Sequence, residues 1–156
     1  MVVTMKVPRK LRKDVSEKTL DAIARAVEEA ESKTSGEIVV HMVHNLLPLE
    51  TARRRAYRAF LAVGIHRTRR RNGVLLFLVM KKRLFEIVAD DGVHEKVGAL
   101  AWEEIARRIT ETIEREGFEA GVCRGVALLG ETLAKHFPRE ERDVDELPDR
   151  PRVEAD

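Results

Sequence analysis

The spacing of apolar residues along the chain alternates between the helical period and the strand period. The first helical pattern, which predicts a helix over about residues 15–33, consists of Leu20, Ile23, Ala24 and Val27. Asp14 and Glu17 fit a capping box at its start. We expect this helix to end near Ser35-Gly36, because Gly favours the position just after a helix C-terminus.

Two largely apolar runs of residues predict strands that are buried on both faces. The runs cover residues 38–43 and 74–80, and continuous runs of this kind are typical of covered strands. Residues 81–83 are too few for anything but a chain reversal, so we expect a hairpin with a strand over residues 84–89. Glu86 interrupts one face of that strand, which predicts a position near the edge of the sheet.

Helical spacing returns in three further segments. One helix is predicted from about residue 49 to Gly64, and Asp90-Asp91-Gly92 is predicted to form a turn. Two long helices follow, with apolar positions from 102 to 113 and from 118 to 137, and Gly117 separates them. The predicted order of elements is therefore α-β-α-β-β-α-α.

This order of elements predicts an α/β fold. A strand–helix–strand crossover favours parallel neighbours, whereas the short reversal at residues 81–83 requires an antiparallel pair. We therefore expect a three-layer α/β/α sandwich with a central mixed β-sheet.

Length and composition limit the classes of protein that fit. The chain has 156 residues, 44% of them hydrophobic, and a single Cys, so we expect one domain without internal disulfides. No apolar run approaches the roughly twenty residues that a membrane-spanning helix needs, and the first residues lack the pattern of a secretory signal. The sequence therefore predicts a soluble, cytoplasmic protein.

Charge divides the chain into three parts, although the net charge is only +2. Residues 1–13 form a basic N-terminal segment, and residues 14–138 hold the predicted domain. Residues 139–156 contain eight acidic residues, four arginines and few apolar residues, a composition that predicts a flexible acidic tail.

Five segments resemble, in order, segments of the TPM domain family, which is named after a thylakoid lumen protein, a photosystem II repair protein and an acetylcholine receptor modulator. They are residues 35–40, 60–64, 71–76, 86–92 and 116–122. The resemblance covers about residues 15–138 and implies an α/β/α sandwich. It also implies three expectations about function, namely acid phosphatase activity, divalent-cation binding at loops beside the sheet, and membrane-protein repair or receptor modulation.

The chain departs from the common pattern of that family at two loops. Arg71 stands where an Asp usually precedes Asn-Gly, and Asp90 replaces the first Gly of a Gly-x-Gly turn. His94 stands where an acid is expected two residues after that turn. These departures argue against cation binding and phosphatase activity in this chain.

The densest set of candidate metal ligands is Asp90, Asp91, His94 and Glu95. These residues follow a predicted strand, and ligand sites in α/β sheets gather at strand ends. Carboxylate oxygens suit calcium or magnesium, and the loop edge expected beside them consists of Asn72, Gly73 and Gly92. The alternative interpretation is the solvated start of a short helix, where the helix dipole favours acids.

An arginine-rich segment spans residues 53–71 without an acidic residue. Guanidinium groups suit phosphate and carboxylate, and the candidate anion-binding residues are Arg67, Arg69, Arg70 and Arg71. Aromatic residues make up 4% of the chain, which argues against nucleic acid as a partner because base stacking needs aromatic rings. The alternative interpretation is a solvated helix face that the acidic tail neutralises.

The leading hypothesis is a non-catalytic binding or accessory module for an unknown protein partner, with a divalent cation at the loop after the hairpin. One alternative is a divalent-metal-dependent acid phosphatase, and a second is an anion- or nucleic-acid-binding protein that uses residues 53–71. The sequence assembles neither a two-metal carboxylate set nor an activated nucleophile. Cys123 is expected to be an inert thiol near the core.

Overall fold

The computed structural model describes residues 2–4, 16–82, 84–140, 149 and 151–154. Its centre is a five-stranded sheet in the order β1-β4-β3-β2-β5. The strands are β1 (Val2–Thr4), β2 (Glu37–Val43), β3 (Gly73–Val79), β4 (Leu84–Ala89) and β5 (Arg152–Glu154). Strands β2 and β3 are parallel, whereas β3 and β4 are antiparallel, which confirms a mixed sheet.

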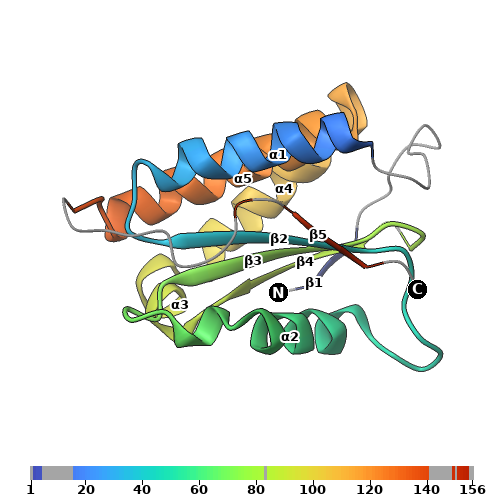
Figure 1. Cartoon of the computed structure of the whole chain (residues 1–156), viewed down its shortest axis with the longest axis horizontal. Coiled ribbons are helices and arrows are strands. Elements are labelled where there is room, and N and C mark those ends of the chain that lie inside the picture. Colours follow the sequence, from blue (N-terminus) through green and yellow to red (C-terminus); the bar gives the residue numbers. More distant parts are fainter. Residues whose placement is uncertain (1, 5–15, 83, 141–148, 150, 155–156) are drawn as a thin grey trace.

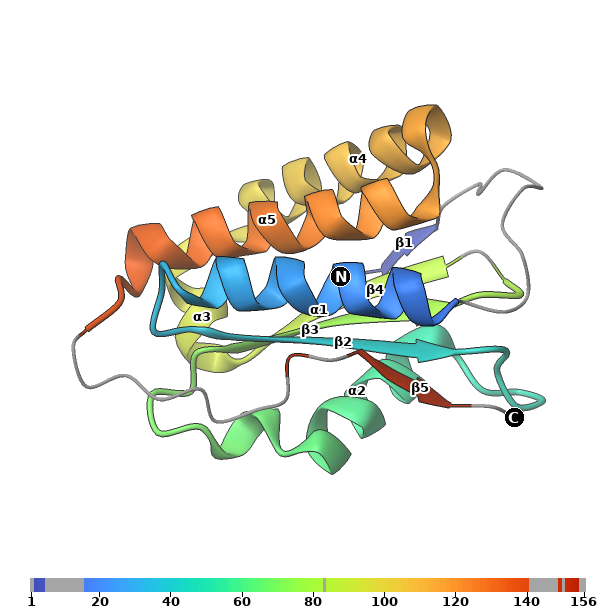
Figure 2. The same cartoon turned by 45° about the horizontal axis from the view of Figure 1, so that its top comes forward.

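Helices cover both faces of this sheet (Figure 1). One face carries α1 (Glu17–Glu31), α4 (Ala99–Glu116) and α5 (Phe118–His136). The other face carries α2 (Ala52–Val63), which is followed by the short helix η1 (Ile65–Arg67). Figure 2 shows the same layers from a second side, with α3 (Asp91–Val97) at one end of the sheet. The predicted α/β/α sandwich is confirmed.

The two central strands separate two apolar cores. Every residue of β2 and β3 is buried, as their continuous apolar runs predict. Because side chains alternate across a strand, Leu76 packs in the core under α1, α4 and α5, while its neighbour Leu75 packs in the core under α2.

Three glycines let the helices of the three-helix layer approach one another closely. A Cβ atom on Gly121 would lie 2.0 Å from Ile113 Cγ1, and one on Gly125 would lie 2.8 Å from Ile109 Cδ1. Gly130 faces α1 in the same way. A larger side chain at these positions would push α5 away from its neighbours.

The structure corrects three local predictions. The first helix begins after Ser16, whose Oγ accepts a hydrogen bond from the Thr19 N–H, and it ends at Glu31 with Ser32, rather than a Gly, as its C-cap. The predicted cap at Asp14 lies outside the described residues. Residues 90–92 are not a separate turn, because the Asp90 side chain caps α3 and the helix continues from there.

Strand β4 is the second strand from one end of the sheet, which agrees with the predicted position near the edge. On its outer side β1 pairs with residues 84–86. Glu86, which suggested an edge, is fully buried. The acidic residue within this apolar strand is therefore buried, and it does not mark an exposed face.

The chain ends contribute strands that the sequence did not predict. Within the predicted flexible tail, β5 pairs in parallel with His41–Val43 of β2, so residues 152–154 belong to the sheet. Near the start of that tail, Glu140 forms an ion pair with Arg70. Residues 1, 5–13, 141–148, 150, 155 and 156 of the two predicted end segments lie outside the described residues. The domain boundaries at 14 and 138 stay a prediction.

Candidate functional site

An ion pair between Arg71 and Asp90 joins the loop before β3 to the start of α3. Arg71 Nε lies 2.8 Å from Asp90 Oδ2, and Arg71 Nη2 lies 2.8 Å from Asp90 Oδ1. Asp90 is 3% exposed, and its Oδ1 also accepts a hydrogen bond from the Asp91 N–H. Two parallel guanidinium–carboxylate bonds fix the orientation of both groups. The hydrogen bond to Asp90 also raises the pKa of Arg71.

Close backbone packing holds this junction together. A Cβ atom on Gly92 would lie 2.6 Å from the Arg71 carbonyl oxygen, so only Gly lets α3 approach the loop this closely. Asn72 Nδ2 donates a hydrogen bond of 3.1 Å to the Ser35 carbonyl. A Cβ atom on Gly73 would collide with Ile65. These contacts bring Asn72, Gly73 and Gly92 to the same edge of the sheet as Asp90.

The candidate cation ligands have different surroundings from one another. Arg71 contacts both carboxylate oxygens of Asp90, and the side chain of Asp91 is 91% exposed. Glu95 is exposed on α3. In the part of the chain that the structure describes, no three His, Cys, Asp or Glu side chains are grouped so that they could hold a metal ion. The calcium or magnesium site stays a prediction.

A cavity of about 260 Å³ lies beside this junction, along the last part of β4. Helix α2, strand β4 and helices α3 and α4 all contribute to its walls. The lining residues are Arg53, Tyr57, Glu86, Ile87, Val88, Ala89, Asp91, His94 and Trp102. Two of the candidate residues from the sequence, Asp91 and His94, therefore line a cavity together with side chains from distant segments.

The last part of β4 has an unpaired outer edge among the described strands. Strand β1 pairs only with Leu84–Glu86, whereas β3 pairs with β4 as far as Ala89. The Asp90 N–H donates a hydrogen bond to the Gly73 carbonyl on β3. By the alternation of an antiparallel ladder, Ile87 and Ala89 therefore direct their N–H and C=O groups away from β3. Both residues line the cavity.

Two buried polar side chains also line the cavity. Trp102 is 4% exposed, and its Nε1–H has no hydrogen-bond acceptor among the described residues. Burial raises the pKa of the Glu86 carboxyl to about 7, while the nearby Arg53 acts in the opposite direction. A buried donor without an acceptor costs free energy. A polar occupant of the cavity would relieve this cost.

Sequence reasoning missed the role of Glu86 and Trp102 in this cavity. It used Glu86 as a sign of a strand edge and placed Trp102 among the core positions of a helix. An acid inside an otherwise apolar strand is a usable signal, because such a group needs a local partner or must become neutral. Trp102 carries no such signal, since its spacing is that of an ordinary core residue.

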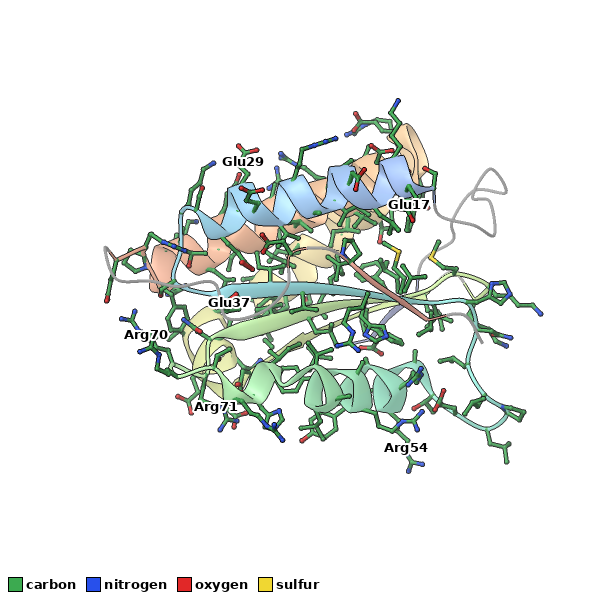
Figure 3. The ribbon with its side chains drawn as sticks, in the orientation of Figure 1. Glu17, Glu29, Glu37, Arg54, Arg70 and Arg71 are labelled. Carbon is green, nitrogen blue, oxygen red and sulfur yellow. The ribbon has the colours of Figure 1, made fainter. Side chains whose placement is uncertain are left out.

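The arginines of segment 53–71 have different surroundings. Glu50 pairs with Arg55 and Arg58, while Arg70 contacts Glu140 and the Ser35 hydroxyl. Within the described part of the chain, no ion pair is formed by Arg53, Arg54, Arg67 or Arg69. Figure 3 shows Arg54 pointing away from the sheet, and Arg70 and Arg71 near the other end of α2. The anion-binding role of Arg67, Arg69, Arg70 and Arg71 stays a prediction.

Burial suppresses the reactivity of two further side chains. It raises the pKa of the Cys123 thiol, and a thiol that stays protonated is a poor nucleophile. For His41, burial and then the charges of Arg152 and Arg55 lower the pKa to about 4. His41 is therefore neutral at physiological pH.

Comparison with known proteins decides the family. The sequence pattern of the TPM domain matches residues 13–132. The chain belongs to the TPM domain family. Its structure is similar to that of the BA42 protein from the psychrophilic bacterium Bizionia argentinensis, with a TM-score of 0.84 and 28% sequence identity over 94% of this chain and 100% of that chain.

A second solved structure shares the TPM-like fold. It is the N-terminal domain of the cg2496 protein from Corynebacterium glutamicum, with a TM-score of 0.58 and 11% identity over 84% of this chain and 87% of that chain. Comparison with curated proteins gives no match. No helix in the described ranges combines the length and the apolar character that crossing a membrane requires.

Two of the three residues expected from the sequence to depart from the common family pattern lie against each other. The structure joins Arg71 and Asp90 in one ion pair, so that each charge is balanced by the other. The junction beside the cavity is held by an ion pair within the chain itself.

Proposed function

We propose that this TPM domain is a non-catalytic binding module that recognises an extended, acidic segment of a partner protein in the cavity beside β4. The observation that carries this proposal is the place of the cavity, which lies along residues 87–89 of β4, where no described strand pairs with the outer side of β4. An open strand edge accepts an extended peptide through main-chain hydrogen bonds, and neighbouring pockets select its side chains.

Backbone groups of β4 provide the attachment points for such a segment. Ile87 and Ala89 each present one donor and one acceptor on the outer side of the sheet. A bound strand would continue the sheet where β1 stops. Its alternate side chains would face α2 on one side and Trp102 on the other.

The side chains around the cavity favour acidic residues in the partner. Arg53 belongs to the lining and forms no ion pair in the described chain, and Trp102 offers a buried N–H. Because burial raises the pKa of Glu86 to about 7, this acid carries only part of a negative charge near neutral pH. The other acid is Asp91, and its charge is partly balanced because its Oδ2 lies 3.8 Å from Arg71 Nη2. Carboxylates form their strongest hydrogen bonds with cationic donors such as Arg53.

A fluorescence titration tests the proposal directly. Trp102 is the only tryptophan of the chain, so its emission reports on the cavity. We expect a capped hexapeptide of alternating Val and Glu to change this emission in a saturable way. The same peptide with Lys in place of Glu should leave the emission unchanged.

Two neighbouring arginines provide a matched pair of variants. Arg53→Glu should weaken binding of the Val/Glu peptide by about tenfold or more, because it puts a like charge against the bound carboxylates. Arg54→Glu makes the same change of charge on a side chain that points away from the sheet (Figure 3) and should weaken binding by less than about twofold at physiological salt. Equal losses in both variants, or no emission change with either peptide, would contradict the proposal.

Turnover of an aryl phosphate, with and without magnesium, tests the absence of catalysis in this proposal. We expect hydrolysis to stay at the rate of the buffer in both conditions. Hydrolysis that requires magnesium and is abolished by Asp91→Ala would instead support the metal-dependent phosphatase.

A further inference from the structure

The loop between β2 and α2 exposes apolar side chains to an unusual degree. Leu47 is 64% exposed and Leu49 is 102% exposed, and Pro48 between them is exposed as well. Single exposed leucines are common on protein surfaces. Two leucines and a proline within three residues form a small, continuous apolar tip.

The conformation of this loop is fixed by its own contacts. The Glu50 N–H donates a hydrogen bond to the Leu47 carbonyl, and the Leu47 N–H donates one to Glu50 Oε1. Glu50 is itself held by ion pairs with Arg55 and Arg58. Leu49 has φ = 66°, a left-handed conformation that is costly for a residue with a side chain. The loop thus exposes both leucines although the backbone of Leu49 is strained. Strained residues of this kind gather at functional sites, so the strain suggests a role for the exposed leucines.

Two lysines lie in the turn that contacts the start of this loop. The turn between β3 and β4 runs along the start of the loop, because the Lys81 N–H donates a hydrogen bond of 2.8 Å to the His44 carbonyl. Lys81 and Lys82 are both exposed, and neither forms an ion pair with a described residue. The one acid of the loop, Glu50, is neutralised by its two arginines. Figure 2 shows the loop and the turn at the same end of the molecule.

We propose that Leu47, Pro48 and Leu49, together with Lys81 and Lys82, form a docking surface for an anionic lipid bilayer. Apolar side chains that enter the boundary between headgroups and acyl chains, next to lysines that contact anionic headgroups, give reversible attachment to a membrane surface. A stable protein interface buries about 800 Å² on each partner, far more than a tip of three residues offers. A bilayer accepts such a tip without a complementary pocket.

The lipid-docking surface and the peptide cavity are built from different residues. The tip follows the end of β2, whereas the cavity lies along the last part of β4 and reaches Arg53 in the first turn of α2. This inference does not depend on the peptide-binding function, and either can fail alone.

Flotation with lipid vesicles tests the docking surface. We expect the full chain to float with vesicles of phosphatidylcholine and phosphatidylglycerol, and to float much less with phosphatidylcholine alone. The double variant Leu47→Ser/Leu49→Ser should lower the bound fraction on anionic vesicles by about tenfold or more, because it removes the inserted apolar surface. Lys81→Glu/Lys82→Glu should lower it similarly and remove the preference for anionic lipid.

Leu100→Ser is the matched control, since Leu100 is 81% exposed on α4, far from the tip in sequence. It should leave vesicle binding unchanged. Equal binding to both kinds of vesicle, or equal loss in Leu100→Ser and in the double variant, would overturn the proposal. Dimerisation through the tip would also overturn the proposal. It would be seen if the unchanged chain does not bind vesicles but forms concentration-dependent dimers in sedimentation velocity, and if Leu47→Ser/Leu49→Ser dissociates these dimers.

Discussion

The two faces of the sheet are covered in different ways. Helices α1, α4 and α5 pack on one face, and glycines at positions 121, 125 and 130 let residues of α1 and α4 pack directly against the backbone of α5. On the other face, among the described residues, α2 packs with only the short helix η1 beside it, and the cavity lies between α2, the end of β4, α3 and α4. The three-helix side is closely packed, and positions 121, 125 and 130 leave no room for larger side chains. The α2 side combines a stable strand with an accessible edge, which is what recognition of a partner requires.

The largest effect is expected on the closely packed side. Gly121→Leu should lower the free energy of unfolding by about 3 kcal/mol or more, because its Cβ would lie 2.0 Å from Ile113 Cγ1. Urea denaturation measures the change. Arg124→Leu, at an exposed position of the same helix, should change stability by less than about 0.5 kcal/mol. If the two variants unfold at the same urea concentration, the contrast between the two faces is wrong.

A smaller effect is expected where the α2 side meets α3. Asp90→Ala removes the cap of α3 and the partner of Arg71, and should lower the free energy of unfolding by about 1–2 kcal/mol. Asp91→Ala, at an exposed neighbouring position, should have little effect. In a double-mutant cycle, Arg71→Met and Asp90→Asn should be less than additive, since each removes the same pair. Full additivity would show that the pair contributes nothing.

A third effect depends on pH and concerns the buried acid of the cavity. Burial raises the pKa of Glu86 from 4.5 to about 7, so between these values the folded chain holds a proton that the unfolded chain releases. The contribution of Glu86 to stability is therefore fully present below about pH 4.5 and is lost as the pH rises through about 7.

Denaturation of the unchanged chain and of Glu86→Gln at several pH values measures this contribution. The stability of the unchanged chain relative to Glu86→Gln should fall from pH 5 to pH 8. His41, whose lowered pKa of about 4 gives a dependence of the opposite sign, is present in both chains and cancels in the difference. A difference that stays constant with pH would place Glu86 in contact with water.

Much of the fold could be predicted because its signals are local. The apolar runs that became β2 and β3 are buried on both faces, so every position of each strand reports the same environment. Strands β1 and β5 were not predicted, because each has three residues and pairs with a strand far away in the sequence. Such pairing depends on tertiary structure and leaves no periodic pattern.

The candidate site could be predicted only in part. The sequence placed Asn72 and Asp90 near one edge, since both adjoin predicted strands, but it did not predict the contact between Arg71 and Asp90. That contact depends on the close packing of the start of α3 against the loop before β3, and Gly92 permits this packing because it has no Cβ atom. The cavity could not be predicted, because its walls come from α2, β4, α3 and α4, which only tertiary packing brings together.

Amide hydrogen exchange at the end of β4 tests the central claim most directly. In the presence of saturating Val/Glu hexapeptide, hydrogen exchange at the amides of Ile87 and Ala89 should slow by about tenfold or more, because the bound strand accepts hydrogen bonds from them. The amide of Val88, which is directed toward β3, should change little. Unchanged exchange at both Ile87 and Ala89, while the peptide still alters the emission of Trp102, would show that no strand adds to β4.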